Sequence, residues 1–167
     1  YSTWNQAYIN AVIGIPLEVY STEPSGCNGI IDDRLAGTDI LVVRHADTCV
    51  AGVGNCAAPS TPSDKLYFQA SNCADEIDLE DLGNEYSFES DPNDLVLTQL
   101  DCSTRQEIRR FVQNIYYIRD YAYEAGDGIP TLVRSEFELS GGTLSNQSPV
   151  ELVEGIEGFQ VRLGIDR

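Results

Sequence analysis

Apolar and polar residues alternate with a period of two along much of the C-terminal half of the chain. In residues 131–139, odd-numbered positions from Val133 onward carry Val, Ser, Phe and Leu, and even-numbered positions carry Arg and Glu. Residues 159–165 repeat this alternation, which is typical of half-buried β-strands. Residues 112–119 are apolar on both faces and contain two adjacent tyrosines, which indicates a more central strand. The breaks between these runs are rich in glycine, so the pattern predicts an antiparallel sheet with tight turns.

Shorter apolar runs predict further elements. Strands or extended segments are expected at 17–20, 39–46, 65–70 and 95–100. A short helical or irregular entry is expected to end by Gly14 and Pro16. The capping-box sequence of residues 103–107 predicts at most two helical turns, up to about Phe111. Residues 149–157 predict a second short helix, with a proline in its first turn.

The chain has 167 residues, which fits one domain spanning residues 1–167. A chain of this size buries roughly 70% of the surface that it exposes when unfolded, so it needs no metal to hold a core. The predicted fold class is α+β: a domain dominated by an antiparallel β-sheet, with long disulfide-tied loops and one or two short helices.

Charge excludes one class of partner. The chain carries 10 basic and 27 acidic residues, a net charge of −17. Such a chain repels phosphate backbones and anionic lipid head groups, so nucleic acid is not an expected partner. Hydrophobic residues make up 42% of the sequence, which argues against a disordered chain.

Five cysteines favour an oxidised, exported protein over a zinc site, because none forms a Cys-x-x-Cys pair and the chain has one histidine. A bridge between Cys49 and Cys56 would contribute about 2.5 kcal/mol, and one between Cys73 and Cys102 about 3.5 kcal/mol. Sequence does not fix this connectivity. Cys27 then remains unpaired, or is paired with a segment outside this chain.

Candidate chemistry is sparse. His45, at the end of a predicted strand, would have to anchor any Ser-His-Asp or Cys-His apparatus, and we interpret it as structural. The acidic stretch after Cys73 is dense enough to hold calcium, although it lacks the EF-hand pattern, and a solvated loop is the simpler interpretation. Its candidate ligands are Asp75, Glu76, Asp78, Glu80 and Asp81. Paired acids of a glycoside hydrolase are a further alternative. We expect no catalytic residue and no cofactor.

Four segments in order resemble the PilW family of type IV pilus minor pilins. They are GTDILVVRHA (37–46), NIYYIRDY (114–121), GIPTLVR (128–134) and VELVEGIEGFQVRLGID (150–166). The last segment is also similar to a minor pseudopilin of type II secretion. Together the four segments cover about a quarter of the chain.

The resemblance implies a pilin-like globular domain that follows an N-terminal hydrophobic helix, which anchors such proteins in the inner membrane and later packs in the fibre. We expect that this helix has been removed from the present chain. The resemblance implies that the protein contacts a membrane only through that missing helix. The implied role is association in a tip or priming complex with other minor pilins and the major pilin; a tip adhesin is a further candidate partner.

The implied location is the inner membrane facing the periplasm, and then the extracellular pilus. Exposed edges of strands within 131–139 and 159–165 are candidate contacts, because a free edge can be completed by another chain. The alternative from another class is a secreted adhesin or ligand-binding module with calcium in the acidic loop.

Overall fold

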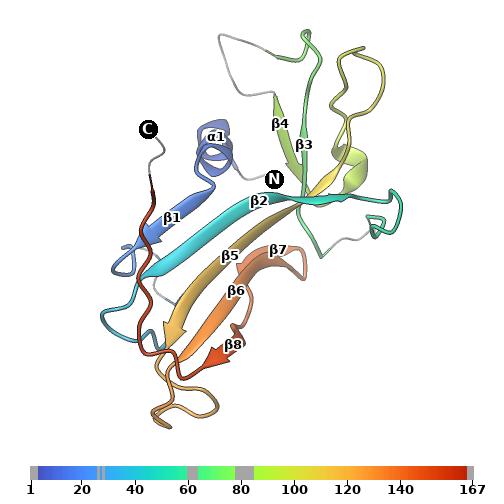
Figure 1. The fold of residues 1–167 in the computed structure, drawn as a ribbon. Helices are drawn as coiled ribbons and strands as arrows, with labels where there is room; N and C mark the ends of the chain where they lie inside the picture. Colours follow the sequence, from blue (N-terminus) through green and yellow to red (C-terminus); the bar gives the residue numbers. More distant parts are fainter. Residues whose placement is uncertain (1–3, 26, 28, 60–63, 78–84, 165–167) are drawn as a thin grey trace. The chain divides into compact units, whose positions relative to one another are not determined.

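The computed structural model describes residues 4–25, 27, 29–59, 64–77 and 85–164. Its elements are α1 (Gln6–Gly14), β1 (Leu17–Tyr20), β2 (Ile40–Val50), β3 (Tyr67–Ala70), β4 (Tyr86–Glu89), the 3-10 helix η1 (Pro92–Asp94), β5 (Arg109–Arg119), β6 (Thr131–Ser140), β7 (Thr143–Asn146) and β8 (Val150–Glu154). Figure 1 labels the helix and the strands. The described chain is therefore mostly antiparallel β-sheet with one short α-helix, as predicted.

The chain divides into two compact units, each assembled from three separate segments. Unit 1 consists of Tyr1–Pro16, Arg44–Val112 and Glu138–Ser145, and unit 2 consists of Leu17–Val43, Gln113–Phe137 and Asn146–Arg167. Strands β2, β5 and β6 each contribute residues to both units. That residues 1–167 behave as a single folding domain remains a prediction.

Unit 2 is built on long antiparallel ladders. β5 pairs with β6 from Asn114↔Glu136 to Arg119↔Thr131, and β6 pairs in turn with β8 (Leu132↔Val153). β1 pairs with β2. Most side chains of β5 are buried, which confirms the central strand expected from its two apolar faces. Figure 1 shows β5, β6 and β8 running side by side.

The core of unit 2 is mainly aliphatic. Its buried members are Ile31, Ile40, Val42, Ile115, Tyr117 and Val133, against which Tyr20 and Ile30 pack. Of these, Val133 lies on the face of β6 that the alternation of residues 131–139 predicted to be apolar, whereas Ile115 and Tyr117 lie on β5, which was predicted to be apolar on both faces. Burial raises the pKa of the Tyr117 phenol to about 12, because the phenolate would lose its hydration.

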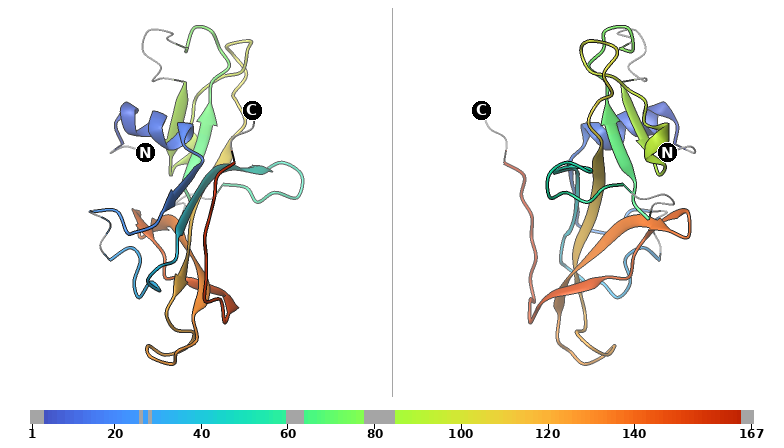
Figure 2. Two further views of the ribbon diagram at one scale, coloured as in Figure 1. Left: turned by 60° about the vertical axis from the view of Figure 1, so that its left-hand side comes forward. Right: turned by 90° about the vertical axis from the view of Figure 1, so that its right-hand side faces the viewer.

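Unit 1 combines short strands with an aromatic core. β3 pairs with β4 (Phe68↔Phe88) and with the start of β5 (Phe68↔Arg109). Helix α1 begins at the cap residue Asn5, whose side chain accepts a hydrogen bond from the Tyr8 N–H. The helix packs against these strands, as Figure 2 shows. The core contains Ile9, Val12, Leu66, Phe88 and Phe111, with Trp4, Ile13, Phe68, Tyr86 and Leu144 packed against it.

Two predictions between β4 and β5 are wrong. Residues 95–100 form no strand, and residues 103–111 form no helix. The Asp101 carboxylate accepts hydrogen bonds from the Ser103 and Thr104 N–H groups, at 3.0 and 2.8 Å. This local turn takes the donors that a capping box would have used, and the chain then enters β5 at Arg109.

Two predictions near the C-terminal end are also wrong. Residues 149–157 do not form a helix, because β8 completes the ladder along β6. The strand ends at Glu154, and the next residue, Gly155, has a φ of +74°. Residues 159–164 run extended but form no strand; the Phe159 carbonyl accepts from the Asp39 N–H at 2.8 Å. Residue 165, the end of that predicted strand, lies outside the described residues.

The pattern missed β4 and β7 and placed the end of β2 too early, since β2 continues to Val50. The predictions for β1, β3, β5 and β6 are confirmed. Among the described residues, no helix combines the length and the apolar character that a membrane crossing requires.

Candidate functional site

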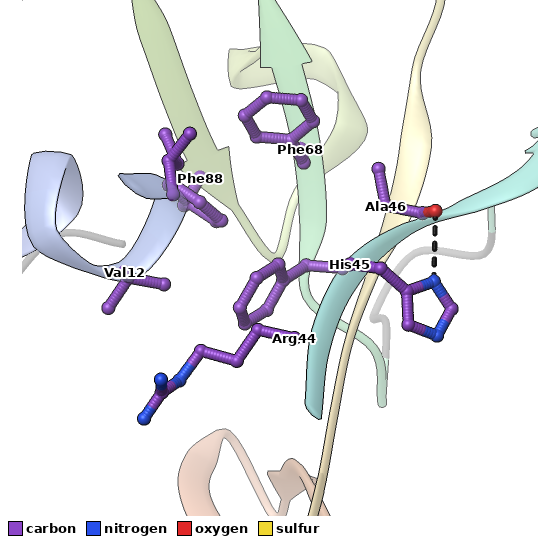
Figure 3. A pocket seen from close by; sticks show the side chains of 8 residues that line it. Val12, Arg44, His45, Ala46, Phe68 and Phe88 are labelled. Carbon is purple, nitrogen blue, oxygen red and sulfur yellow. Dashed lines mark hydrogen bonds between the residues drawn. The ribbon is translucent and has the colours of Figure 1, made fainter. Parts of the chain in front are cut away.

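A cavity of about 180 Å³ opens in unit 1 between α1 and the strands (Figure 3). Its lining consists of Val12, Ile13, Arg44, His45, Ala46, Phe68, Phe88 and Phe111. None of these lining residues is an acid, so the converging carboxylates of a hydrolase are not found here. The volume is also below the roughly 300 Å³ at which small-molecule pockets usually begin.

His45 does not point into this cavity. Its imidazole turns away from Phe68 and Phe88 in Figure 3. The ring Nδ1 lies 3.0 Å from the Ala46 carbonyl oxygen, and the side chain is exposed. His45 therefore lies within strand β2 and not at its end, because β2 is longer than predicted.

The neighbouring Arg44 binds backbone. Its Nη1 donates to the Ile15 carbonyl at 3.2 Å, and its own N–H donates to the Pro16 carbonyl at 2.8 Å. Arg44 thus ties the chain that leaves α1 to β2. Arg44 and His45 are the cation and the imidazole of the cavity lining, and the contacts described above join both side chains to backbone carbonyl groups.

Of the calcium candidates, Asp75 and Glu76 are described, whereas Asp78, Glu80 and Asp81 lie outside the described residues. Both carboxylate oxygens of Glu76 already accept hydrogen bonds: one from the Ser71 hydroxyl and the Thr98 N–H (3.0 Å), the other from the Thr98 hydroxyl (2.8 Å). The Ser71 hydrogen bond, followed by that from the Thr98 backbone, lowers the pKa of Glu76 below its usual 4.5. Glu76 is therefore engaged as a structural tie.

Asp75 lies beside a disulfide. One of its carboxylate oxygens is within 4.8 Å of the Cys73 and Cys102 sulfur atoms. Those sulfurs are bonded to each other, so the carboxylate is the one group of this cluster that could bind a hard cation. The arrangement offers too few oxygens for a calcium site among the described residues.

Two disulfides are present, Cys49–Cys56 and Cys73–Cys102. They are the two pairings that the positions of the cysteines in the sequence indicated. The sequence separations are 7 and 29 residues, and both bridges belong to unit 1. Cys27 in unit 2 is a half-buried free thiol.

Sequence reasoning missed the role of Arg119, which is 8% exposed at the end of β5. Its guanidinium donates to the Tyr121 carbonyl at 2.9 Å, to the Ala122 carbonyl and to the Glu151 carboxylate at 2.6 Å. It also lies 4.1 Å above the Tyr121 ring. An arginine at the end of an almost wholly buried strand is the signal that would have identified this anchor.

The edge of unit 2 differs from the predicted one. β6 is not a free edge, because β5 and β8 pair with its two sides. β8 is the outer strand, and all five of its residues are exposed, including Val150, Leu152 and Val153. An exposed apolar edge strand of this kind is suited to contact with another chain.

Comparisons of the chain with protein-family models, with curated proteins and with solved structures gave no match.

Proposed function

We propose that this chain is the pilin-like globular domain of a minor pilin, which joins other minor pilins and the major pilin in the complex that primes type IV pilus assembly. In this proposal the protein acts by association and not by turnover. It resides in the inner membrane facing the periplasm before assembly, and in the extracellular pilus afterwards.

The observation that carries the proposal is the arrangement of the segments that resemble the PilW family. NIYYIRDY contains the second half of β5, GIPTLVR contains the start of β6, and VELVE forms β8. These three strands are direct neighbours in unit 2, with Ile118 opposite Leu132 and Leu132 opposite Val153. Segments separated along the chain thus form one continuous piece of sheet.

The chemistry of the described residues also favours association. The cavity lining carries no acid, Glu76 is engaged by Ser71 and Thr98, and His45 faces away from the cavity. Exposed apolar side chains lie instead on β8, on loops, and at Tyr8 of α1 and Leu17 of β1, where another protein can reach them. Two disulfides fit an oxidising compartment such as the periplasm.

The test is deletion of the gene in the cells that produce the chain, followed by electron microscopy of surface fibres and immunoblotting of sheared fibres. We expect the deletion to reduce pilus number at least tenfold, and the wild-type chain to be found in the sheared fraction. Normal fibre number, together with absence of the chain from the fibres, would contradict the proposal.

Removal of calcium distinguishes a minor pilin from the alternative, a secreted calcium-binding adhesin. A calcium-dependent adhesin would lose stability on chelation, because a ligand that binds the folded state stabilises it by mass action. For a minor pilin held by disulfides and sheet, we expect the same melting temperature with EDTA as with added calcium, measured by differential scanning calorimetry. A clear decrease in EDTA would favour the adhesin.

A further inference from the structure

The loop of residues 95–106, here called the Leu100 loop, presents one large apolar side chain to solvent at its tip. Leu100 is 81% exposed, and Val96 in the same loop is 67% exposed. Both views of Figure 2 place this loop beyond the end of β3, beside the chain that follows that strand. Burying a leucine side chain contributes about 1.5–3 kcal/mol, so a partner that covered Leu100 would gain binding free energy.

The base of the loop is fixed by a buried side chain. Gln69 on β3 is fully buried. Its amide nitrogen donates to the Gln106 carbonyl, and its amide oxygen accepts from the Leu97 N–H, both at 2.8 Å. The Gln106 N–H donates to the Leu97 carbonyl at 2.9 Å, so the two sides of the loop are also joined directly.

Hydrogen bonds to residues outside the loop hold both of its sides. Glu76 accepts from the backbone and the side chain of Thr98, and the Asn72 N–H donates to the Thr98 carbonyl at 3.0 Å. On the other side, the Arg105 side chain donates to the carbonyl groups of Leu95 (2.6 Å) and Pro92. Thr98 and Arg105 form an isolated antiparallel bridge.

The tip itself is closed by backbone hydrogen bonds, by a carboxylate cap and by a disulfide. The Gln99 N–H donates to the Thr104 carbonyl at 2.8 Å, and the Cys102 N–H donates to the Gln99 carbonyl at 2.9 Å. The Asp101 carboxylate accepts hydrogen bonds from the Thr104 hydroxyl and from the Thr104 and Ser103 N–H groups. These hydrogen bonds, first that of the Thr104 hydroxyl, lower the pKa of Asp101 to about 2. Cys102 is bonded to the buried Cys73. The backbone around Leu100 is therefore ordered before any partner arrives, which avoids much of the entropy cost of binding.

Charge identifies the kind of partner. Leu100 is adjacent to Asp101 and two residues from Cys102, whose sulfur lies within 4.8 Å of an Asp75 carboxylate oxygen. Arg105, the single cation in the sequence of this loop, is directed to backbone carbonyls. A second copy would bring a further charge of −17 to this surface, and like charges oppose that contact.

We propose that Leu100, flanked by Asp75 and Asp101, docks into an apolar pocket bordered by Lys or Arg side chains on a different protein. An exposed apolar side chain on ordered backbone, with charged neighbours, fits an interface in which a central anchor is buried and a polar rim sets specificity. The identity of the partner as a neighbouring minor pilin rests on the proposed function, whereas the docking surface does not.

The experiment is site-specific photo-crosslinking of the full-length protein in the cells that produce it. The photo-reactive residue p-benzoylphenylalanine replaces Leu100 in one variant and Val53 in the matched control. Val53 is a suitable control because it is apolar, is 60% exposed and lies in a loop closed by the Cys49–Cys56 disulfide. We expect an adduct with a different protein from position 100 but not from position 53, and about fivefold less adduct when Asp75→Lys is added.

The second measurement is the affinity of the chain for the protein that the crosslink identifies. Leu100→Lys is expected to raise the Kd about tenfold or more, whereas Val53→Lys changes it less than about twofold. Because Leu100 is exposed, Leu100→Lys should keep the circular dichroism spectrum of the wild-type protein, which excludes misfolding as the cause.

The outcomes separate the two proposals. An adduct with another pilin supports both, and a position-100 adduct with a protein of another class supports the docking surface and contradicts the minor-pilin proposal. Equal adducts from positions 100 and 53, an adduct with a second copy, or no adduct at position 100 would overturn the docking surface. Those last results leave the deletion experiment as the independent test of pilus assembly.

Discussion

The two units of the chain reach a stable core by different means. In unit 1, the strands β3 and β4 have four residues each, and aromatic rings fill the space between them and α1. In unit 2, β5 and β6 share a ladder of six residue pairs, and the core is mostly aliphatic. Both disulfides belong to unit 1.

This difference shows how irregular backbone is stabilised. A long ladder satisfies its own N–H and C=O groups, so unit 2 needs few additional ties within its strands. The loops of unit 1 have no such ladder, and their backbone groups are satisfied by side chains such as Gln69, Glu76 and Asp101. Covalent bridges then limit the freedom of these loops when the chain unfolds.

The largest expected effect is that of Phe88→Ala in the aromatic core of unit 1. Phe88 is 1% exposed, and its ring centroid lies 5.0 Å from that of Phe111 and 5.3 Å from that of Trp4. Removing the ring should lower the free energy of unfolding by about 3–5 kcal/mol, because it leaves a cavity that the neighbours cannot fill. Urea denaturation followed by Trp4 fluorescence measures this loss.

The same titration tests the single-domain prediction. Trp4 is the only tryptophan and reports on unit 1, whereas far-UV circular dichroism reports on all strands. Because β2, β5 and β6 supply residues to both units, we expect both signals to shift together. A fluorescence transition that moves while the circular dichroism transition stays would show that the units unfold separately.

The second effect is removal of the disulfides from unit 1. Replacing Cys73 and Cys102 by alanine should lower the free energy of unfolding by about 3.5 kcal/mol, and the pair Cys49 and Cys56 by about 2.5 kcal/mol. The ranking follows from sequence separations of 29 and 7 residues. Urea denaturation of the two double variants provides the measurement, with Cys27→Ala as the control for loss of a thiol. Equal losses, or a larger loss for the shorter loop, would contradict the chain-entropy explanation.

The sequence predicts the ladder of unit 2 better than the loops of unit 1, for a physical reason. Apolar patterning along a strand is local information: alternation with a period of two identified β6, and a run that is apolar on both faces identified β5. The run at 95–100 has the same apolar character but no strand beside it to complete a ladder. Its backbone instead binds Gln69 and Glu76, side chains that are distant in sequence.

The candidate site was less predictable than the fold. The apolar run at 95–100 predicted a strand, whereas the structure has a loop in which Leu95 is buried and Leu100 is 81% exposed. No local pattern tells which leucine faces solvent, because that depends on the turn made by Asp101 and on the bridge from Cys102 to Cys73. The prediction of a helix at 149–157 is wrong for a similar reason. The pairing of β8 with β6 joins two different segments of the chain, and a local pattern does not contain it.

The third effect tests whether unit 2 also depends on one side-chain anchor. Arg119→Lys keeps the charge but loses the planar fork that reaches the Tyr121 and Ala122 carbonyls and Glu151 together. Leaving a buried carbonyl without its donor costs about 1–3 kcal/mol, so we expect a loss of about 2 kcal/mol. Thermal denaturation with Arg134→Lys, a partly exposed arginine on β6, as the control measures it. Equal melting temperatures for both variants would show that the β5–β6 ladder suffices.

The smallest effect concerns the carboxylate ties and their response to pH. The pKa of Glu76 in unit 1 is lowered below 4.5, mainly by the Ser71 hydroxyl. The pKa of Asp127 in unit 2 is lowered to about 2 by backbone N–H groups, first that of Ile129. A group whose pKa is lower in the folded state stabilises the fold above its unfolded pKa. That stability is lost as pH falls through the folded pKa, below pH 4.5 for Glu76 and between about pH 4 and 2 for Asp127.

The variant Glu76→Gln tests how much the Glu76 hydrogen bonds contribute to stability. An amide has one acceptor oxygen and places a donor against the Thr98 or Ser71 donors, so the variant should be about 1 kcal/mol less stable at pH 7. It should also lose less stability than the wild type between pH 4.5 and 3, because the titrating group is gone. Asp127→Asn should flatten the curve at lower pH, towards pH 2. Thermal melts of both variants from pH 7 to 2 measure these windows, and a Glu76→Gln curve parallel to the wild type would show that the tie contributes nothing to the acid response.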